Sequence, residues 1–288
     1  MAWVASKKSV AVEKIGQRKH LMEEKCVQND SELQTTTVWS FPNRGKWLTH
    51  NAKYRGNWAP QIPSNLIRLY SKEGDTVLDP MVGSGTTMIE AKSLGRQGIG
   101  FDIHPEVVKL AQESCKFNCE KCYEPIIKQG DAHALKAVEN DSIDLIATHP
   151  PYLNIIKYGI KSADGDLSAI SSLQKFCDEI EKVAQECHRV LKPGKYCAIL
   201  IGDTRRRRHY VPLAFSVMQR FLKVGFILKE DVIKVQHNCA TTRYWGAQDK
   251  DFLLIMHEHL FIFRKLADGE NKSIFKDSML NTDLGQNG

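Results

Sequence analysis

Three acidic residues and two glycines stand where strands alternate with helices. The run D-P-M-V-G-S-G-T-T, residues 79–87, separates an apolar strand from a helical segment. Gly83 and Gly85 lack a Cβ, so the backbone there can turn tightly and approach a ligand. Asp102 closes the next apolar run and is placed to accept two ribose hydroxyls. Asp131 follows a third strand and is expected on the same rim, so the pattern predicts a nucleoside-like ligand.

The first residue of this turn narrows the choice of nucleoside. The turn has no G-K-[ST], which makes a phosphate-cradling loop a poor interpretation. A carboxylate at Asp79 would repel a pyrophosphate but suits a cation, such as the ammonium group of S-adenosylmethionine. The alternative is an acid that caps a turn above glycines required only for packing.

A second motif, T-H-P-P-Y at residues 148–152, follows another apolar strand. Two prolines end the strand ladder and set the directions of the preceding carbonyls. An exocyclic amino group on a base needs such acceptors for its hydrogens. Tyr152 offers a ring that could stack on a base taken out of its duplex. The alternative is a rigid loop without chemistry, which the position of the motif after a strand disfavours.

The elements that carry these motifs alternate regularly. We predict helices at 62–70, 170–191 and 211–224, a helix ending near Gly95 and one beginning near Pro105. We predict strands at 76–78, 98–101, 125–127, 142–147, 196–201, 226–235 and 252–263. This alternation predicts an α/β fold: a doubly wound, mostly parallel seven-stranded Rossmann-like sheet with helices on both faces.

Composition limits the class of protein. The 288 residues are 42% hydrophobic and 26% charged, with a net charge of +6, which is typical of a globular protein. No apolar run has the length of a membrane span, and residues 1–17 do not resemble a secretory signal, so we expect a cytoplasmic protein. We expect an arm at 1–37, one catalytic domain at 38–265 and a polar tail at 266–288. The eight cysteines are scattered and are expected to be reduced.

The two motifs together resemble the S-adenosylmethionine-dependent DNA amino-methyltransferases, which make N4-methylcytosine or N6-methyladenine. Three further segments resemble the same family: W-A-P-Q-I-P-S-N-L-I-R-L-Y-S at 58–71, I-G-D-T-R at 201–205 and M-H-E-H-L-F-I-F-R-K at 256–265. The resemblance covers roughly 38–265, with the cofactor motif first. It implies a methyltransferase sheet whose last strand is antiparallel, and a role in restriction–modification or phage systems, with a cognate restriction endonuclease as a possible partner.

The resemblance also implies the roles of individual residues. It assigns cofactor binding to Asp79, Pro80, Gly83, Gly85, Thr86, Asp102, Asp131 and Thr148, with Asp102 on the ribose and Asp131 on the adenine amino group. It assigns the target base to His149, Pro150, Pro151 and Tyr152. The family usually has Asp, Asn or Ser where this chain has His149. A neutral imidazole can accept one hydrogen bond, but this departure leaves cytosine-N4 and adenine-N6 both open.

The expected reaction is direct transfer, in which the amino nitrogen attacks the sulfonium methyl group and the enzyme supplies proximity and orientation. Cytosine-C5 methylation would need a cysteine nucleophile after a proline, and the chain has no Pro-Cys dipeptide. Two alternatives stay open: an RNA guanine-N2 methyltransferase, and a DNA-binding homologue that has lost its catalysis. The oligomeric state and the target sequence are left open as well.

Basic residues gather in two places. Residues 33–72 contain six basic residues and no acid, interleaved with aromatic residues. We expect contacts with the phosphates of double-stranded DNA from Arg44, Lys46, Lys53, Arg55, Arg205, Arg206, Arg207 and Arg208. The alternative for each cluster is a solvated surface. We expect the residues that recognise the DNA base sequence to lie in 1–60, 153–172 or 237–250.

Two constellations suggest metals, and we expect a metal at neither. Cys115, Cys119 and Cys122 have the C-x3-C-x2-C spacing of an iron–sulfur site, but they also continue one face of a helix. His257 and His259 alternate within an apolar strand and share a face. Histidines whose hydrogen bonds are satisfied are more common there than a metal pair.

Overall fold

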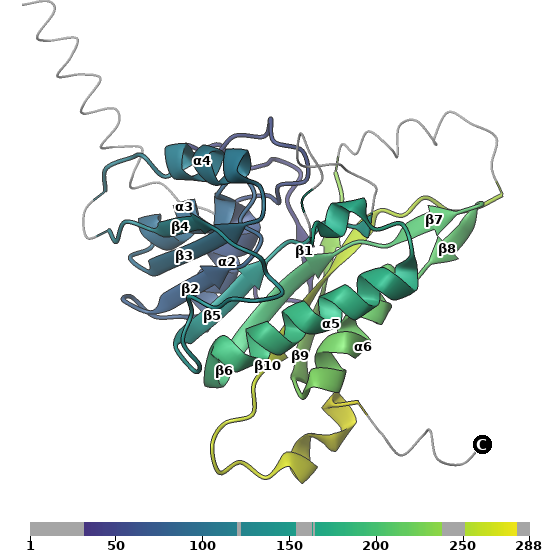
Figure 1. Cartoon of the computed structure of the whole chain (residues 1–288). Helices are drawn as coiled ribbons and strands as arrows, with labels where there is room; N and C mark the ends of the chain where they lie inside the picture. The colour runs from purple at the N-terminus through teal and green to yellow at the C-terminus, as the bar shows by residue number, and fades with distance from the viewer. Residues whose placement is uncertain (1–31, 120–121, 154–162, 164, 238–250, 281–288) are drawn as a thin grey trace, which may run out of the picture.

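A computed structural model describes residues 32–119, 122–153, 163, 165–237 and 251–280. Its centre is an eight-stranded mixed sheet in the order β1-β9-β10-β6-β5-β2-β3-β4 (Figure 1). The neighbouring pairs are parallel except for those of β10, which is antiparallel to β9 and to β6. The strands are β1 (Val38–Ser40), β2 (Thr76–Asp79), β3 (Gln97–Asp102), β4 (Ile126–Gln129), β5 (Ile143–Thr148), β6 (Leu191–Ile201), β9 (Ile227–Val235) and β10 (His257–Arg264).

Helices cover both faces of the sheet. On one face α5 (Leu173–Val190) and α6 (Leu213–Val224) lie side by side. On the other lie α2 (Gln61–Tyr70) and α3 (Thr86–Ser93), with α4 (Pro105–Ser114) beside α3. Alternation along β6 explains the two layers, because Ile199 packs with the α5 and α6 core whereas Leu200 packs with the core beneath α2. Two short 3-10 helices span Leu167–Ala169 and Lys272–Ser278.

The chain reverses its direction of winding at β2. From β2 it continues to β3 and β4 on one side, and β5 and β6 then lie on the other side. Ligands of open α/β sheets bind beyond the carboxyl ends of the strands at such a switch point. Asp79 ends β2 and Thr148 ends β5, so the two sequence motifs meet at this point.

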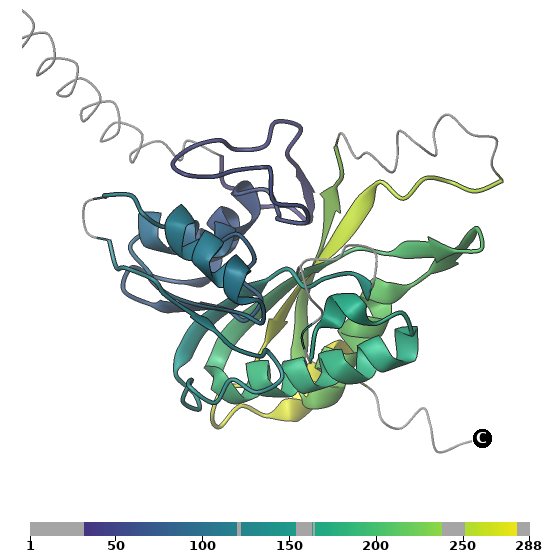
Figure 2. The same ribbon diagram turned by 45° about the horizontal axis from the view of Figure 1, so that its top comes forward.

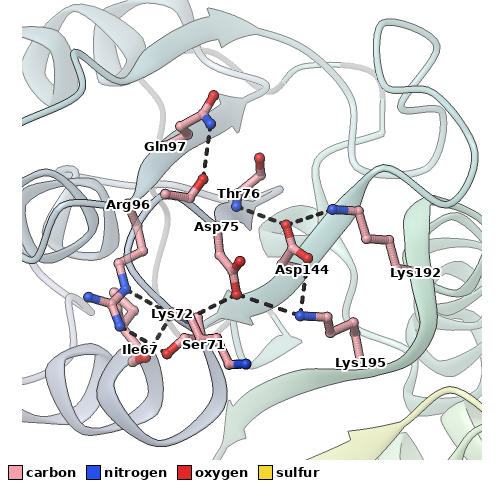
Figure 3. Close-up of polar contacts among 11 residues, drawn as sticks. Ile67, Ser71, Lys72, Asp75, Thr76, Arg96, Gln97, Asp144, Lys192 and Lys195 are labelled. Carbon is pink, nitrogen blue, oxygen red and sulfur yellow. Dashed lines mark hydrogen bonds and ion pairs between the residues drawn. The ribbon is translucent and has the colours of Figure 1, made fainter.

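Charged residues connect the strands at their amino-terminal ends, at the end of the sheet opposite the switch point (Figure 3). Asp144, near the start of β5, accepts hydrogen bonds from the Thr76 backbone N–H at 3.1 Å and from Lys192 Nζ at 2.8 Å, and its other oxygen lies 3.2 Å from Lys195 Nζ. Burial acts to raise the pKa of Asp144, but the hydrogen bonds from Lys192 and Thr76 outweigh it and lower the pKa. This cluster joins the amino ends of β2, β5 and β6.

The predicted fold class is confirmed, with differences in the strands. The sheet has eight strands rather than seven, because β1 pairs with β9 through backbone bonds that no local pattern announces. The strand expected to begin at Tyr196 starts at Leu191. A hairpin of β7 (Thr204–Arg206) and β8 (His209–Val211) was not predicted, and it projects from the sheet in both views (Figure 2).

The expectation of one helical face through the three cysteines is wrong. Helix α4 ends at Ser114, and Cys115 is its C-cap. The buried ammonium of Lys92 donates a hydrogen bond to the Cys115 carbonyl at 2.9 Å, which satisfies the end of the helix. Cys119 and Cys122 lie beyond the helix and form a disulfide, so the expectation of reduced thiols fails for this pair.

Several sequence expectations fall outside the described residues. These are the arm at 1–31, half of the segment 153–172, the segment 238–250 and the tail at 281–288, so the base-reading roles expected there stay predictions. Within the described part of the chain, no helix combines the length and the apolar character that crossing a membrane requires.

Candidate active site

Asp79 links the two motifs. Its Oδ1 accepts a hydrogen bond from Thr148 Oγ1 at 2.7 Å, and its Oδ2 accepts one from Thr87 Oγ1 at 2.6 Å. Burial raises the pKa of Asp79 to about 6, although these hydrogen bonds act to lower it. Thr148 was expected to bind the cofactor, but it is not among the residues that line the cavity. Its hydrogen bond to Asp79 instead links the ends of β2 and β5.

The two glycines have different tasks. Both adopt left-handed backbone angles, with φ of 51° at Gly83 and 90° at Gly85. Gly83 lines the cavity, and its N–H donates to Asp102 Oδ2 at 3.2 Å. Gly85 is not among the lining residues. A Cβ there would approach the Ala111 backbone to 3.2 Å, so Gly85 lets the turn pack against α4.

Asp102 and Asp131 flank the same cavity. Asp102 Oδ1 accepts the His104 N–H at 3.0 Å, and burial raises the pKa of Asp102 against the effect of this bond. Asp131 lies two residues beyond the end of β4, and its Oδ1 is 2.5 Å from His133 Nδ1. The hollow between them encloses about 760 Å³ of space, part of which is open to solvent. Of the predicted residues it is lined by Asp79, Pro80, Gly83, Thr86, Asp102, Asp131, His149 and Pro151.

The prolyl turn reaches the cavity through His149 and Pro151. Pro150 is buried and Tyr152 is half-buried, and neither is among the lining residues. The Tyr152 ring lies against Gly202, where a Cβ would come within 2.8 Å of it. The phenol oxygen lies 2.6 Å from His149 Nε2, and its hydroxyl donates to Glu258 Oε1 at 2.9 Å. Stacking of this ring on a base therefore stays a prediction, whereas the hydroxyl has defined partners.

Glu258 is the functional residue that sequence reasoning missed. It lies on β10, is 7% exposed, and its Oε2 is 2.8 Å from Lys234 Nζ on β9. Burial acts to raise the pKa of Glu258, but the Lys234 charge and the hydrogen bonds from Lys234 and Tyr152 outweigh it, so the pKa is lowered and the carboxylate is ionised. The available signal was an acid between two histidines in an apolar strand.

His149 is a neutral imidazole in this setting. Burial lowers its pKa to about 4, with Lys234 and Arg44 acting in the same direction and Glu258 against it. The Trp58 ring stacks on the imidazole at a centroid distance of 5.8 Å. His149 Nδ1 is buried with no close hydrogen-bond partner among the described residues, although the backbone of Gly56 acts to raise the pKa of His149. A buried polar atom without a close partner is costly, which makes Nδ1 a candidate contact for a ligand.

The basic residues of the first cluster differ in exposure. Lys46, Lys53 and Arg55 are exposed. Arg44 is half-buried and donates to the Asn57 carbonyl at 3.2 Å. The segment that carries them docks on α3, because buried Glu90 accepts hydrogen bonds from Trp47 Nε1 at 2.7 Å and lies 2.6 Å from His50 Nε2.

The four arginines of the second cluster lie on or beside the β7–β8 hairpin. Arg205 donates to the Leu253 carbonyl at 2.8 Å and lies over the Phe252 ring, and Arg208 pairs with Asp251 at 2.9 Å. Arg206 donates to the Ser171 carbonyl. Arg206, Arg207 and Arg208 are exposed, so the hairpin presents positive charge to solvent. Contacts of either cluster with phosphates stay a prediction.

The comparisons with known proteins agree with this geometry. The sequence profile of a DNA methylase family, the N6/N4 methyltransferases, matches residues 2–113 and 143–283, which include both motifs. The chain belongs to this family. The chain is 29% identical over 175 residues to the type II methyltransferase M.HpaI of Haemophilus parainfluenzae, a match that covers 58% of the chain and 51% of M.HpaI.

Two other comparisons concern a shorter stretch of the chain and its fold. The type II methyltransferase M2.DpnII of Streptococcus pneumoniae is 39% identical over 89 residues, covering 30% of this chain and 31% of M2.DpnII. The chain therefore spans about half or less of the length of these relatives. The crystal structure of TrmN from Thermus thermophilus superposes with a TM-score of 0.50 at 21% identity, covering 74% of this chain and 50% of TrmN, which shows a shared fold.

Proposed function

We propose that this methylase transfers a methyl group from S-adenosylmethionine to the exocyclic amino nitrogen of a base flipped out of double-stranded DNA, either N4 of cytosine or N6 of adenine. The observation that carries the proposal is the 2.7 Å hydrogen bond between Thr148 and Asp79 at the switch point. It brings the Gly-rich turn and the prolyl turn to one cavity, which His149 and Asp79 both line.

The residues at the cofactor end fit this molecule. S-Adenosylmethionine supplies an electrophilic methyl group on a sulfonium centre, and it also carries an ammonium group, a ribose diol and an adenine. Asp79 gives the cationic end a buried carboxylate, and Asp102 gives the diol an acceptor. Asp131 provides an acceptor for the adenine amino group. Gly83 suits the turn because its φ is positive, and a Cβ there would make only an ordinary contact with Tyr54, at 3.4 Å.

At the base end, Glu258 decides which nitrogen of His149 is free. The ionised Glu258 can only accept, so the Tyr152 hydroxyl donates its hydrogen bond to it. The phenol oxygen must then accept a hydrogen bond from His149 Nε2–H. The remaining nitrogen, Nδ1, then carries a lone pair. We assign this lone pair as the acceptor for one hydrogen of the target amino group, in place of the oxygen that the family usually supplies there.

This hydrogen bond orients the nucleophile. With one amino hydrogen held by His149 Nδ1, the nitrogen lone pair can point toward the methyl group, and the geometry contributes proximity and orientation. As the new N–CH₃ bond forms and the S–CH₃ bond breaks, the amino nitrogen must lose a proton. His149, with a pKa of about 4, does not keep that proton at neutral pH, so the proton passes to water.

The relatives support a biological setting. M.HpaI and M2.DpnII are type II methyltransferases, and we infer for this chain a comparable place in restriction–modification beside a cognate endonuclease. The cytoplasmic location expected from the sequence belongs to the same proposal. Extracts of cells that carry the gene, assayed for DNA cleavage that prior methylation by this protein blocks, test the endonuclease partner.

The test of the activity itself uses methyl-labelled cofactor with separate DNA and RNA substrates, followed by digestion and separation of the nucleosides. We expect label in N4-methylcytosine or N6-methyladenine from DNA. Label confined to RNA would replace the proposal with the RNA guanine-N2 alternative. DNA binding without label in either substrate would indicate a homologue without catalysis.

A further inference from the structure

A group of two histidines and one aspartate lies where β6 ends and β10 begins. Because these strands are antiparallel, His259 pairs in register with Ile201, the last residue of β6, and Asp203 follows shortly after it. His257 and His259 alternate onto the same face of β10, with ring centroids 5.2 Å apart. One ligand atom from each of the three side chains lies within 4.8 Å of the other two.

The spacing suits a first-row transition metal. Ligands held about 2.0–2.2 Å from a tetrahedral zinc ion lie roughly 3.4 Å from one another. His259 Nε2 is 3.7 Å from Asp203 Oδ2, close to that value. The half-buried His257 also brings one ring nitrogen within 4.8 Å of the ligand atoms of Asp203 and His259.

Hydrogen bonds from surrounding residues orient two of the three candidate ligands, as is usual for metal ligands. Asp231 Oδ1 lies 3.1 Å from His259 Nδ1, which therefore donates to it and leaves the Nε2 lone pair facing Asp203. Asp203 is fixed by the Ala214 N–H, which donates to its Oδ1 at 2.8 Å, and by the Tyr210 hydroxyl, which donates to its Oδ2. The side chains of Asp203 and His259 are 1% and 6% exposed.

Glu258 separates this group from the active site. It lies between the two histidines in β10, so its side chain faces the prolyl turn while theirs face the other side of the sheet. None of the three candidate ligands lines the cavity at the switch point. The group is therefore independent of the proposed methyl transfer, and an ion there would not act on the reacting atoms.

We propose that Asp203, His257 and His259 bind one divalent transition-metal ion, with zinc as the default and an open fourth position for water. Two imidazoles and one carboxylate are ligands that Zn²⁺, Fe²⁺ and Co²⁺ accept. The alternative is a doubly protonated His259 between Asp203 and Asp231, which would need no third donor and leaves His257 without a role. The bound ion would anchor the β7–β8 hairpin, since Asp203 immediately precedes β7 and Tyr210 of β8 contacts it.

Zinc uptake by the full-length protein tests the proposal. The protein is stripped with a chelator, dialysed and titrated with Zn²⁺ against a chromogenic zinc indicator, and a second sample takes Co²⁺ for visible absorption. We expect one equivalent of Zn²⁺ per chain, a cobalt spectrum with nitrogen and oxygen ligands, and a melting temperature that rises with added Zn²⁺.

Two variants make the test specific. His257→Ala removes a half-buried ligand and should weaken Zn²⁺ binding at least tenfold while the metal-free melting temperature stays near that of the wild type. His209→Ala, an exposed histidine of β8, is the matched control and should bind as the wild type does. The proposal is overturned if the wild type takes up no Zn²⁺. It is equally overturned if His257→Ala keeps full affinity, because the ion would then lie elsewhere.

Discussion

Glu258→Gln is the change that most sharply probes how His149 works. The variant keeps the shape of the side chain but replaces one oxygen by an NH₂ group. Lys234 lies 2.8 Å from Oε2 and can be satisfied only by an acceptor, so the amide oxygen will face Lys234 and the NH₂ will face Tyr152. The Tyr152 hydroxyl can then no longer donate to residue 258. It will donate to His149 Nε2 instead, 2.6 Å away.

The consequence is an inverted tautomer. With Nε2 accepting, the proton of the neutral imidazole moves to Nδ1, and the target amino group meets a donor where it needs an acceptor. The loss of one oriented hydrogen bond in a transition state costs about 3–4 kcal/mol, or roughly 10²–10³-fold in kcat. Cofactor binding should change little, because Glu258 does not line the cavity.

Steady-state methylation kinetics and histidine ¹⁵N chemical shifts measure the two halves of this argument. We expect kcat to fall by the stated factor, the KM for the cofactor to stay within about threefold, and the His149 nitrogen shifts to exchange their tautomer pattern. Glu230→Gln on the neighbouring strand β9 is the control and should leave both readings unchanged. A kcat within threefold of the wild type, or unchanged His149 shifts, would refute the reasoning.

Three further predictions follow from the same contacts. His149→Asn, which restores an oxygen acceptor, should retain methylation within about tenfold of the wild type, whereas His149→Ala should lose at least 10²-fold, as measured by label incorporation into DNA; equal losses would argue against an acceptor role. Because burial raises the pKa of Asp79 to about 6, its carboxylate becomes protonated as the pH falls below 6, and affinity for the cationic cofactor should weaken by up to about tenfold per pH unit in calorimetric titrations. Asp79→Asn should abolish that dependence, and a persistent slope would assign it to another group. Asp144→Asn should lower the free energy of unfolding by about 1–3 kcal/mol at pH 7. Since the folded pKa of Asp144 is depressed, its stabilisation is present above the unfolded pKa and is lost as the pH falls through the folded value, so the difference from the wild type in denaturant melts should close below about pH 4; a constant difference would contradict this origin.

The parts of the fold that sequence predicted are those with a strong local signal. The strands that carry Asp79, Asp102 and Thr148 are short apolar runs that end at a polar residue, and the structure places all three at the expected edge. Pro105 opens α4 as expected, since proline fits the first turn of a helix. Asp131 also reaches the cavity, although its strand ends two residues earlier.

The parts that sequence did not predict depend on distant partners. Strand β1 exists because Val38, Trp39 and Ser40 pair with residues of β9 far along the chain. Helix α4 ends where the buried Lys92 ammonium donates a hydrogen bond to the Cys115 carbonyl, although the apolar residues keep a helical spacing through the cysteines. In both cases a tertiary contact overrides the local pattern.

The site shows the same division between local and distant signals. The Gly-rich turn and the prolyl turn could be recognised because their residues are close in sequence. Glu258 and Lys234 could not, because they act through Tyr152 and come from strands much later in the chain. Only the assembled sheet supplies the burial that lowers the pKa of His149 and the Tyr152–Glu258 pair from which we infer its tautomer.

Mass spectrometry of nucleosides from the DNA of cells that express this protein tests the central claim most directly. The claim is that the Asp79 turn and the His149 turn form one site for methyl transfer to an amino nitrogen of DNA. We predict N4-methylcytosine or N6-methyladenine in DNA from cells with the wild type, and neither in cells with Asp79→Ala. The appearance of 5-methylcytosine instead, or the same modified base at the same level with Asp79→Ala, would contradict it.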